Sequence, residues 1–191
     1  MQNFFRAATL MLLGLLANIS FGKESPSALQ TVDDFYKKRL NFSHQPHADV
    51  PPPTIAFSKA FQTQIAKSEK VCESYSTGIC GWGAEGDEYL YAQEYDSLLS
   101  YENSGIKFKE IAKNTIEVKL NIYPSEREDT ESNIRTIIFL MIKEGDNWVA
   151  DDILYGMDSS SRKFLESESA YYIENPDPDS KMGKVKQLKT K

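Results

Sequence analysis

The stretch TIEVKLNIY, residues 115–123, decides the fold that the sequence predicts. Apolar residues occupy every second position of this stretch, and polar residues fill most of the positions between them. The apolar set is Ile116, Val118, Leu120 and Ile122. Because successive side chains of a β-strand point to opposite faces, this alternation indicates a strand with one buried face and one wetter face.

The neighbouring segments extend this strand into an antiparallel meander. Residues 105–111 are expected to form a strand that leads into it through a turn at Lys113-Asn114. The run IRTIIFLMIK, residues 134–143, is continuously apolar, which favours a central strand, although its periodicity is also consistent with a helix. The turn EGDN and the strand WVADDILY then complete the meander at Tyr155.

Helical spacing dominates the part of the chain before the meander. Ser25 and Pro26 are expected to begin a first helix that ends near Asn41, and Thr54 is expected to cap a second helix that reaches Cys72. A proline-rich loop separates the two helices. Tyr89-Leu90-Tyr91 is interpreted as a short first strand. Residues 159–167 are interpreted as a short helix with Phe164 and Leu165 directed inward.

These elements predict an α+β fold with N-terminal helices packed on one face of a curved antiparallel sheet. The chain is long enough for one domain with a sizeable core. We assign that domain to residues 23–173. Residues 174–191 form a polar, Lys-rich tail that is expected to be disordered.

Residues 1–22 have the layout of a secretory signal peptide. Arg6 precedes an apolar run over residues 7–17, and small residues stand at Ser20 and Gly22. The run is shorter than the ~20 apolar residues of a membrane span, so no stable membrane anchor is expected. The segment predicts export to the periplasm.

The exported body is acidic. The chain has 22 basic and 28 acidic residues, a net charge of −6, and removal of Arg6 with the signal peptide makes the remainder more acidic. Nucleic-acid binding needs a surplus of Lys and Arg, so the charge argues against nucleic acid and favours a basic protein partner.

Cys72 and Cys80 are the two cysteines of the chain. Two cysteines this close in an oxidising compartment are expected to form a disulfide. A redox centre would favour the C-x-x-C spacing, and a zinc site would need two further ligands that the neighbouring sequence does not supply. The disulfide would attach the end of the second helix to a glycine-rich loop.

The segment that follows Cys80 combines carboxylates with aromatic rings. Its carboxylates, which include Glu88 and Asp96, can serve as general acids or bases or can be solvated loop charges. Aromatic rings with a polar tip are common at protein interfaces, and they also fill cores. Acidic groups among tyrosines on a disulfide-fixed loop would suit a basic protein surface. The residues assigned to partner binding are Trp82, Glu85, Asp87, Tyr89 and Tyr91.

Glu94 and Asp152 are the alternative candidates, as carboxylates of a pocket. Asp151 and Asp152 are neighbours on a strand, so one of them faces inward unless a bulge intervenes, and an inward aspartate needs a hydrogen-bonded partner or a pocket. No catalytic motif, cofactor or metal site is expected. His44 and His47 form H-x-x-H, but a proline-rich loop does not fix their geometry and no third ligand lies nearby.

Three segments together resemble a bacterial envelope family known as domain of unknown function 3828. They are FSKAFQTQIAKSEK, GDEYLYAQEYD and NWVADDILYG, and the resemblance covers residues 27–167. It implies the cone-shaped fold of nuclear transport factor two, in which helices close over a bent sheet. The family brings no established catalytic residues. Some proteins of this fold act as immunity factors against secreted toxins, and others are enzymes or assembly modules, so the resemblance supports the fold more than any activity.

The sequence leads to three hypotheses of function. The first is a periplasmic, non-enzymatic binding protein, in its sharpest form an immunity protein that neutralises a toxin. The second is a small-molecule enzyme in which an inward Asp152 or Glu94 acts as acid or base. The third is a ligand carrier or envelope scaffold with an apolar cavity for lipid or peptidoglycan fragments. Pairing into a homodimer is left open.

Overall fold

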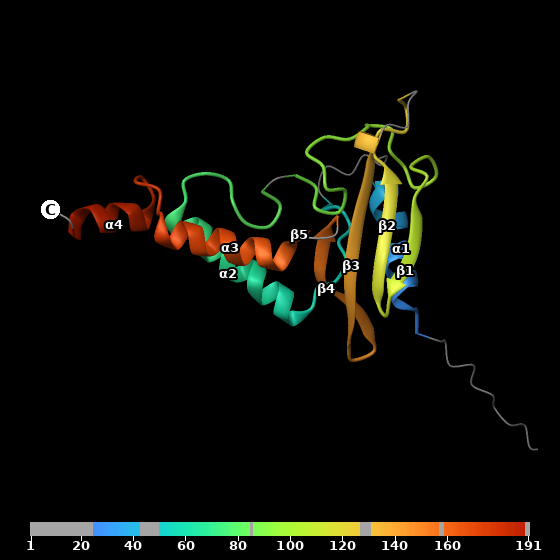
Figure 1. Ribbon diagram of the computed structural model, residues 1–191, viewed down its shortest axis with the longest axis horizontal. Helices are drawn as coiled ribbons and strands as arrows, with labels where there is room; N and C mark the ends of the chain where they lie inside the picture. The colour runs from blue at the N-terminus through green and yellow to red at the C-terminus, as the bar shows by residue number, and fades with distance from the viewer. Residues whose placement is uncertain (1–24, 43–49, 85, 127–130, 157–158, 190–191) are drawn as a thin grey trace, which may run out of the picture.

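The alternating residues 115–123 lie in the second strand of a five-stranded antiparallel sheet with the order β1-β2-β3-β4-β5. The computed structural model describes residues 25–42, 50–84, 86–126, 131–156 and 159–189. The strands are β1 (Lys107–Ala112), β2 (Thr115–Asn121), β3 (Ile134–Glu144), β4 (Asn147–Tyr155) and β5 (Ser159–Ser160). Residues 134–144 are thus a strand, and the predicted α+β fold with a curved antiparallel sheet is confirmed (Figure 1).

Helix α1 (Ala28–Phe42) covers one face of the sheet and forms the core with it. The ring of Tyr36 lies 6.0 Å from each of the rings of Phe108 and Phe139, measured between centroids. The alternating residues of β2 complete the core from the sheet side, because Ile116, Val118 and Leu120 are all buried. The side chain of Ser27, rather than Ser25, caps the helix by accepting a hydrogen bond from the amide of Gln30 at 3.1 Å.

A β-bulge on β4 changes the faces that strict alternation predicts. Leu140 pairs with Asp152 and Met141 with Ala150, which leaves Asp151 as the extra residue. Alternation places Ala150 and Ile153 on opposite faces, yet both are fully buried in the same core. The extra residue shifts the side-chain phase by one position, which is what a bulge does.

Helix α2 (Lys59–Tyr75) begins later than the sequence predicts. Its N-cap is Ser58, whose hydroxyl accepts from the amide of Phe61 at 3.0 Å, not Thr54. The preceding residues are extended because they pair with the bulged strand. The amide of Ser58 donates to the carbonyl of Ala150 (2.9 Å), and the amide of Ala150 donates to that of Ala56 (2.8 Å).

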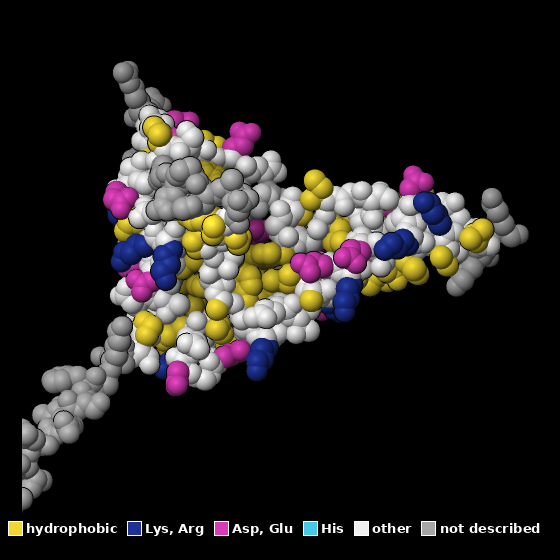
Figure 2. All heavy atoms as spheres, turned by 180° about the vertical axis from the view of Figure 1, so that it is seen from behind, with side chains coloured by type: hydrophobic (Ala, Val, Ile, Leu, Met, Phe, Trp, Pro, Cys, Tyr) yellow, Lys and Arg dark blue, Asp and Glu magenta, His cyan; other side chains and the backbone are white. Residues whose placement is uncertain are grey.

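Helices α2 and α3 (Ser161–Glu174) lie side by side and extend away from the sheet, with α4 (Lys181–Lys189) beyond them (Figure 1). Only α1 therefore covers the sheet as predicted, and α2 packs mainly against α3. We call α2, α3 and α4 the arm. Seen from behind, hydrophobic side chains gather where the arm meets the sheet, and charged side chains follow the arm outward (Figure 2).

The C-terminal prediction needs two corrections. Helix α3 is longer than residues 159–167, and it buries Leu165 but leaves Phe164 45% exposed. The predicted disordered tail contains α4, because Ser180 accepts a hydrogen bond from the amide of Gly183 (3.0 Å) and Asp177 accepts one from the amide of Thr77 (2.6 Å). These contacts start the helix and attach it to the end of α2.

Residues 89–91 form a turn instead of the predicted strand. The amides of Asp87 and Ala92 donate to each other's carbonyls at 2.9 and 3.3 Å, which closes the turn. Tyr91 takes a positive φ of 48° at its end, a backbone conformation that strands do not use. Across the described ranges, the structure holds no helix with the length and apolar character of a membrane span.

Candidate functional site

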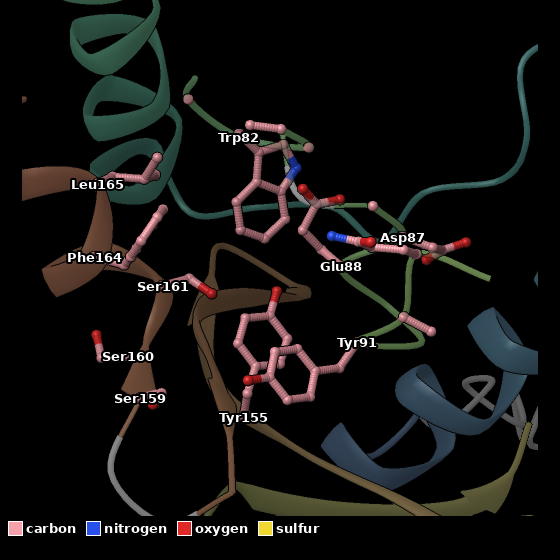
Figure 3. A pocket seen from close by; sticks show the side chains of 16 residues that line it. Trp82, Asp87, Glu88, Tyr91, Tyr155, Ser159, Ser160, Ser161, Phe164 and Leu165 are labelled. Atoms are coloured by element: carbon pink, nitrogen blue, oxygen red, sulfur yellow. The ribbon is translucent and has the colours of Figure 1, made fainter. Parts of the chain in front are cut away.

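A cavity of about 400 Å³ lies between residues 81–93, the end of β4 and the start of α3 (Figure 3). We call the described residues of this segment, 81–84 and 86–93, the pocket loop. Its walls are aromatic and acidic on the loop side and carry serine hydroxyls on the side of α3. None of the described residues that line it is a lysine, arginine or histidine.

The disulfide and α3 hold the first end of the pocket loop. Cys72 and Cys80 are bonded, as predicted, which ties the loop to the last turn of α2. The next amide, that of Gly81, donates to Oε2 of Glu168 on α3 at 2.9 Å. Glu168 lies close to both sulfur atoms, but the cysteines are bonded to each other and supply no free thiolate for a metal. The clasp prediction is thus confirmed.

Helix α1 holds the middle of the loop. Nη2 of Arg39 donates to Oδ2 of Asp87 at 2.6 Å in a largely buried ion pair, and its Nη1 donates to the carbonyl of Pro53. The hydroxyl of Tyr36 donates to the carbonyl of Tyr89 at 2.6 Å. A Cβ at Gly86 would lie 2.5 Å from the carbonyl oxygen of Ala92, so only glycine fits this turn.

Glu88 supplies the pocket's distinctive carboxyl group. It is partly buried, it lines the cavity, and its carboxylate lies beside the indole of Trp82 (Figure 3). Burial raises the pKa of the Glu88 carboxyl above its usual value, the Asp87 carboxylate adds to the rise, and nearby backbone amides and Arg39 offset part of it. Since Arg39 is already bound to Asp87, the negative charge of an ionised Glu88 has no partner among the described ion pairs.

Two stacked tyrosines form the floor of the pocket (Figure 3). The rings of Tyr91 and Tyr155 are nearly parallel, at 6°, with centroids 4.4 Å apart. Tyr91 is 51% exposed at the mouth, and Nε of Arg135 donates to its carbonyl at 3.1 Å. Burial raises the pKa of Tyr155 far above its usual value.

Two buried hydroxyls in this pocket lack hydrogen-bond partners among the described residues. They are Tyr155 Oη and Ser161 Oγ, and Ser161 is only 3% exposed. The nearby Ser161 hydroxyl lowers the pKa of Tyr155 against the larger effect of burial, but the two groups do not reach hydrogen-bonding geometry. Buried hydroxyls are normally bonded, so these two groups keep hydrogen-bonding capacity that the described residues do not use.

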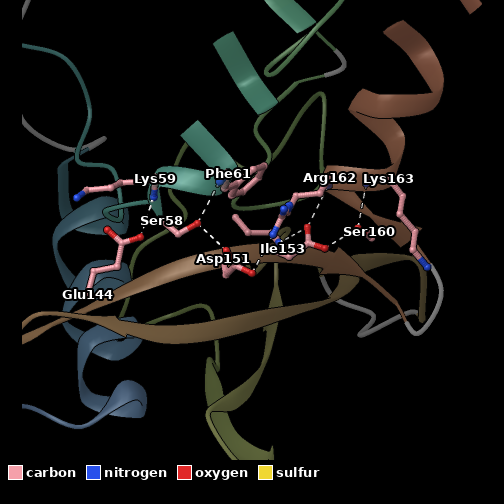
Figure 4. A network of polar contacts seen from close by, with 10 residues as sticks. Ser58, Lys59, Phe61, Glu144, Asp151, Ile153, Ser160, Arg162 and Lys163 are labelled. Carbon is pink, nitrogen blue, oxygen red and sulfur yellow. Dashed lines mark hydrogen bonds and ion pairs between the residues drawn. The ribbon is translucent and has the colours of Figure 1, made fainter. Parts of the chain in front are cut away.

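Asp152 is buried, but it contributes to capping a helix and does not line the cavity. Figure 4 shows the polar contacts around its neighbour Asp151 and the starts of α2 and α3. The Asp152 carboxylate accepts from the amide of Arg162 at 3.1 Å and from the hydroxyl of Ser160. Asp151 binds Ser58 Oγ (2.6 Å) and Nη1 of Arg162 (2.9 Å). The pair thus joins the starts of α2 and α3 to β4.

The other predicted site residues divide into those that line the pocket and those that do not. Trp82, Asp87 and Tyr91 line it. Tyr89 is only 4% exposed and its ring packs against Phe35, so a contact between Tyr89 and a partner stays a prediction that its burial does not favour. Glu94 is exposed and lies outside the lining, so it is not the pocket's carboxylate. Glu85, His44 and His47 lie outside the described residues.

Sequence reasoning missed Tyr155 and Ser161 and did not separate Glu88 from its neighbours. Tyr155 and Ser161 lie more than 60 residues from the pocket loop, so no local pattern connects them to it. The only local signal was the run of serines at residues 159–161, which is typical of a helix N-terminus.

Comparison with protein-family models, with curated proteins and with solved structures finds no significant match to this chain. Membership of the domain of unknown function 3828 family therefore stays a prediction. The arguments about function that follow rest on the residues of the pocket.

Proposed function

We propose that this chain is a non-enzymatic binding protein that recognises a basic protein partner through the pocket loop. The observation that carries the proposal is the composition of the pocket, whose described lining combines aromatic rings and carboxylates and contains no basic residue. Aromatic anchors set in a rigid depression dominate the energy of protein interfaces, and an acidic surface attracts a basic partner.

The rigidity of the loop supports this proposal. A disulfide fixes its first end to α2, and a buried ion pair fixes its middle to α1. Preorganisation lowers the entropy that a surface loses when it binds. The exposed ring of Tyr91 is therefore presented in one orientation, which is what a contact residue needs.

We further propose that the protein acts in the periplasm and that its partner is a secreted toxin. The sequence of residues 1–22 supports export, and the disulfide is compatible with an oxidising compartment. Neutralisation of a toxin would follow if the partner's basic active-site region were covered by the acidic loop.

A small-molecule enzyme is the second candidate, and one observation favours it. Glu88, with its raised pKa, stands in an open cavity near two unpartnered hydroxyls, and a carboxyl group with a raised pKa is suited to act as a general acid. Glu88 thus replaces Glu94 and Asp152 in this alternative.

Affinity purification of the exported chain tests the main proposal. The full-length chain carries a C-terminal tag, is expressed in a Gram-negative host, and is offered periplasmic extract and the purified products of neighbouring genes. The test variant is Tyr91→Ala, and the control is Tyr95→Ala, because Tyr95 is also exposed, at 39%, but lies outside the pocket lining.

We expect a basic protein that is retained and inhibited by the wild type and by the control, and that is released by Tyr91→Ala. Retention of no basic protein, or equal retention by both variants, would show that the loop is not the recognition surface.

A further inference from the structure

We infer that the pocket binds an alkylammonium group, such as a lysine side chain of the partner, between the rings of Trp82 and Tyr91 and the carboxylate of Glu88. The inference rests on the proposed function, since it names the chemical group that the basic partner would insert. The proposed function relies on the negative charge of the loop, whereas this inference names the chemical group that the cavity binds.

The aromatic walls of the cavity favour a cation. Trp82 lines one side, and the Tyr91–Tyr155 stack lies across the space from it (Figure 3). The indole is held by edge-to-face contacts with Phe57 and Phe61, at centroid distances of 5.5 and 5.2 Å. Aromatic faces attract cations, and pockets of such rings recognise quaternary ammonium and methyl-lysine ligands.

The charges around the cavity favour the same ligand. Asp87 is balanced by Arg39, with 2.6 Å between their nitrogen and oxygen atoms, so an ionised Glu88 leaves one negative charge at the pocket. An anionic ligand would meet this charge and the Asp87 carboxylate without a basic residue among the described lining to receive it. A bound ammonium group would balance the charge and would lower the pKa of Glu88 toward its usual range.

The unpartnered hydroxyls supply the remaining acceptors. An ammonium group carries three N–H donors and no acceptor. The Glu88 carboxylate can accept one of them, and the oxygens of Ser161 and Tyr155 can accept the others. Both hydroxyls are buried without a partner among the described residues, and Ser161 points toward the two tyrosines in Figure 3.

The experiment uses two matched peptides and the exported full-length protein. One peptide is acetyl-Ala-Lys-Ala-amide, and the other carries Nε-acetyl-lysine, which keeps the alkyl chain but removes the charge. Binding is measured by calorimetry and by the indole N–H signal of Trp82. Trp148 serves as an internal reference, because it lies on β4 beside Lys143 and outside the pocket.

We expect the charged peptide to shift the Trp82 signal and to bind at least about tenfold more tightly than the neutral one, because a charge-assisted hydrogen bond is lost with the ammonium. Glu88→Gln should weaken the charged peptide by a similar factor, and Glu94→Gln should leave it unchanged. Equal binding of the two peptides would mean that the pocket does not recognise the ammonium charge, and it would overturn the inference. Absence of binding at millimolar peptide also overturns it.

The outcome separates this inference from the proposed function. A basic protein that is retained through Tyr91, together with no difference between the peptides, would refute the lysine pocket and leave the binding function in place. Glu88-dependent peptide binding without any retained protein would refute the protein partner and leave an ammonium site for a smaller ligand.

Discussion

The ring of Tyr91 stacks on the ring of Tyr155 with 4.4 Å between centroids, and this contact joins the pocket loop to the end of β4. The two residues are far apart in the chain. Nε of Arg135 donates to the carbonyl of Tyr91, and the backbone of Tyr91 takes a positive φ of 48° where the rings meet. A bulky residue in that conformation is uncommon and concentrates at functional sites. The unusual backbone of Tyr91 therefore lies in the pocket that we propose as the binding site.

Tyr155→Phe should stabilise the protein, because it removes a buried hydroxyl without a described partner and keeps the stack. We expect the free energy of unfolding in urea to rise by about 1 kcal/mol. Tyr123→Phe is the control, since the Tyr123 hydroxyl donates to the carbonyl of Glu94 at 3.0 Å, and its loss should lower stability slightly. Equal destabilisation by both variants would mean that the Tyr155 hydroxyl is already bonded.

Glu88→Gln should raise the melting temperature at neutral pH. The folded pKa of Glu88 is raised by burial and by the Asp87 carboxylate, so its ionisation opposes folding at pH values above that pKa. As pH falls through the raised pKa, the wild type binds a proton more readily when folded, and the gain from glutamine disappears. Thermal unfolding from neutral to acidic pH measures this, with Glu94→Gln as control; a gain that persists in acid would contradict it.

Asp152→Asn should lower the free energy of unfolding by about 1 to 2 kcal/mol, because one carboxylate serves the amide of Arg162 and the hydroxyl of Ser160 at the start of α3. Binding of the lysine peptide should be unaffected. If Asp152→Asn instead abolished binding or activity while stability stayed at the wild-type value, the Asp152 carboxylate would have a direct role in function.

Replacing both Cys72 and Cys80 by serine should lower the free energy of unfolding by about 2 to 3 kcal/mol, the entropic value of closing so short a loop. Affinity for the lysine peptide should fall as well, because the clasp positions the pocket loop beside Glu168. A reducing agent added to the wild type should reproduce both effects. Unchanged affinity would show that Arg39 and Tyr36 hold the loop without the clasp.

Local patterns predicted the sheet well. The alternation of β2 and the turn at Lys113-Asn114 appear in the structure nearly as expected, because strand burial is a property of successive residues. Two of the elements that differ from the prediction, at Ser58 and Ser180, do so because contacts far along the chain compete with local capping rules. Ser58 donates hydrogen bonds to the carbonyl of Ala150 and to the carboxylate of Asp151. The segment around Ser180 is attached to α2 because Asp177 accepts a hydrogen bond from the amide of Thr77.

The pocket was only partly predictable for the same reason. Trp82, Asp87 and Tyr91 lie close together in sequence and were identified by composition. Whether a carboxylate of that segment reaches the cavity depends on the turn at Gly86, which directs Glu88 inward and leaves Glu94 outside. Ser161 joins the site only through the docking of α3, which no pattern near the loop encodes.

The hydrogen bond from Gly81 to Glu168 spans 87 positions of the chain. Contacts of such separation form late, because the entropy of closing a long loop is lost before the contact rewards it. A chain that is still emerging from a ribosome or a translocation channel lacks α3 and therefore has no finished pocket. The proposed recognition therefore requires α3, whose Glu168 must reach a loop that is synthesised 87 positions earlier.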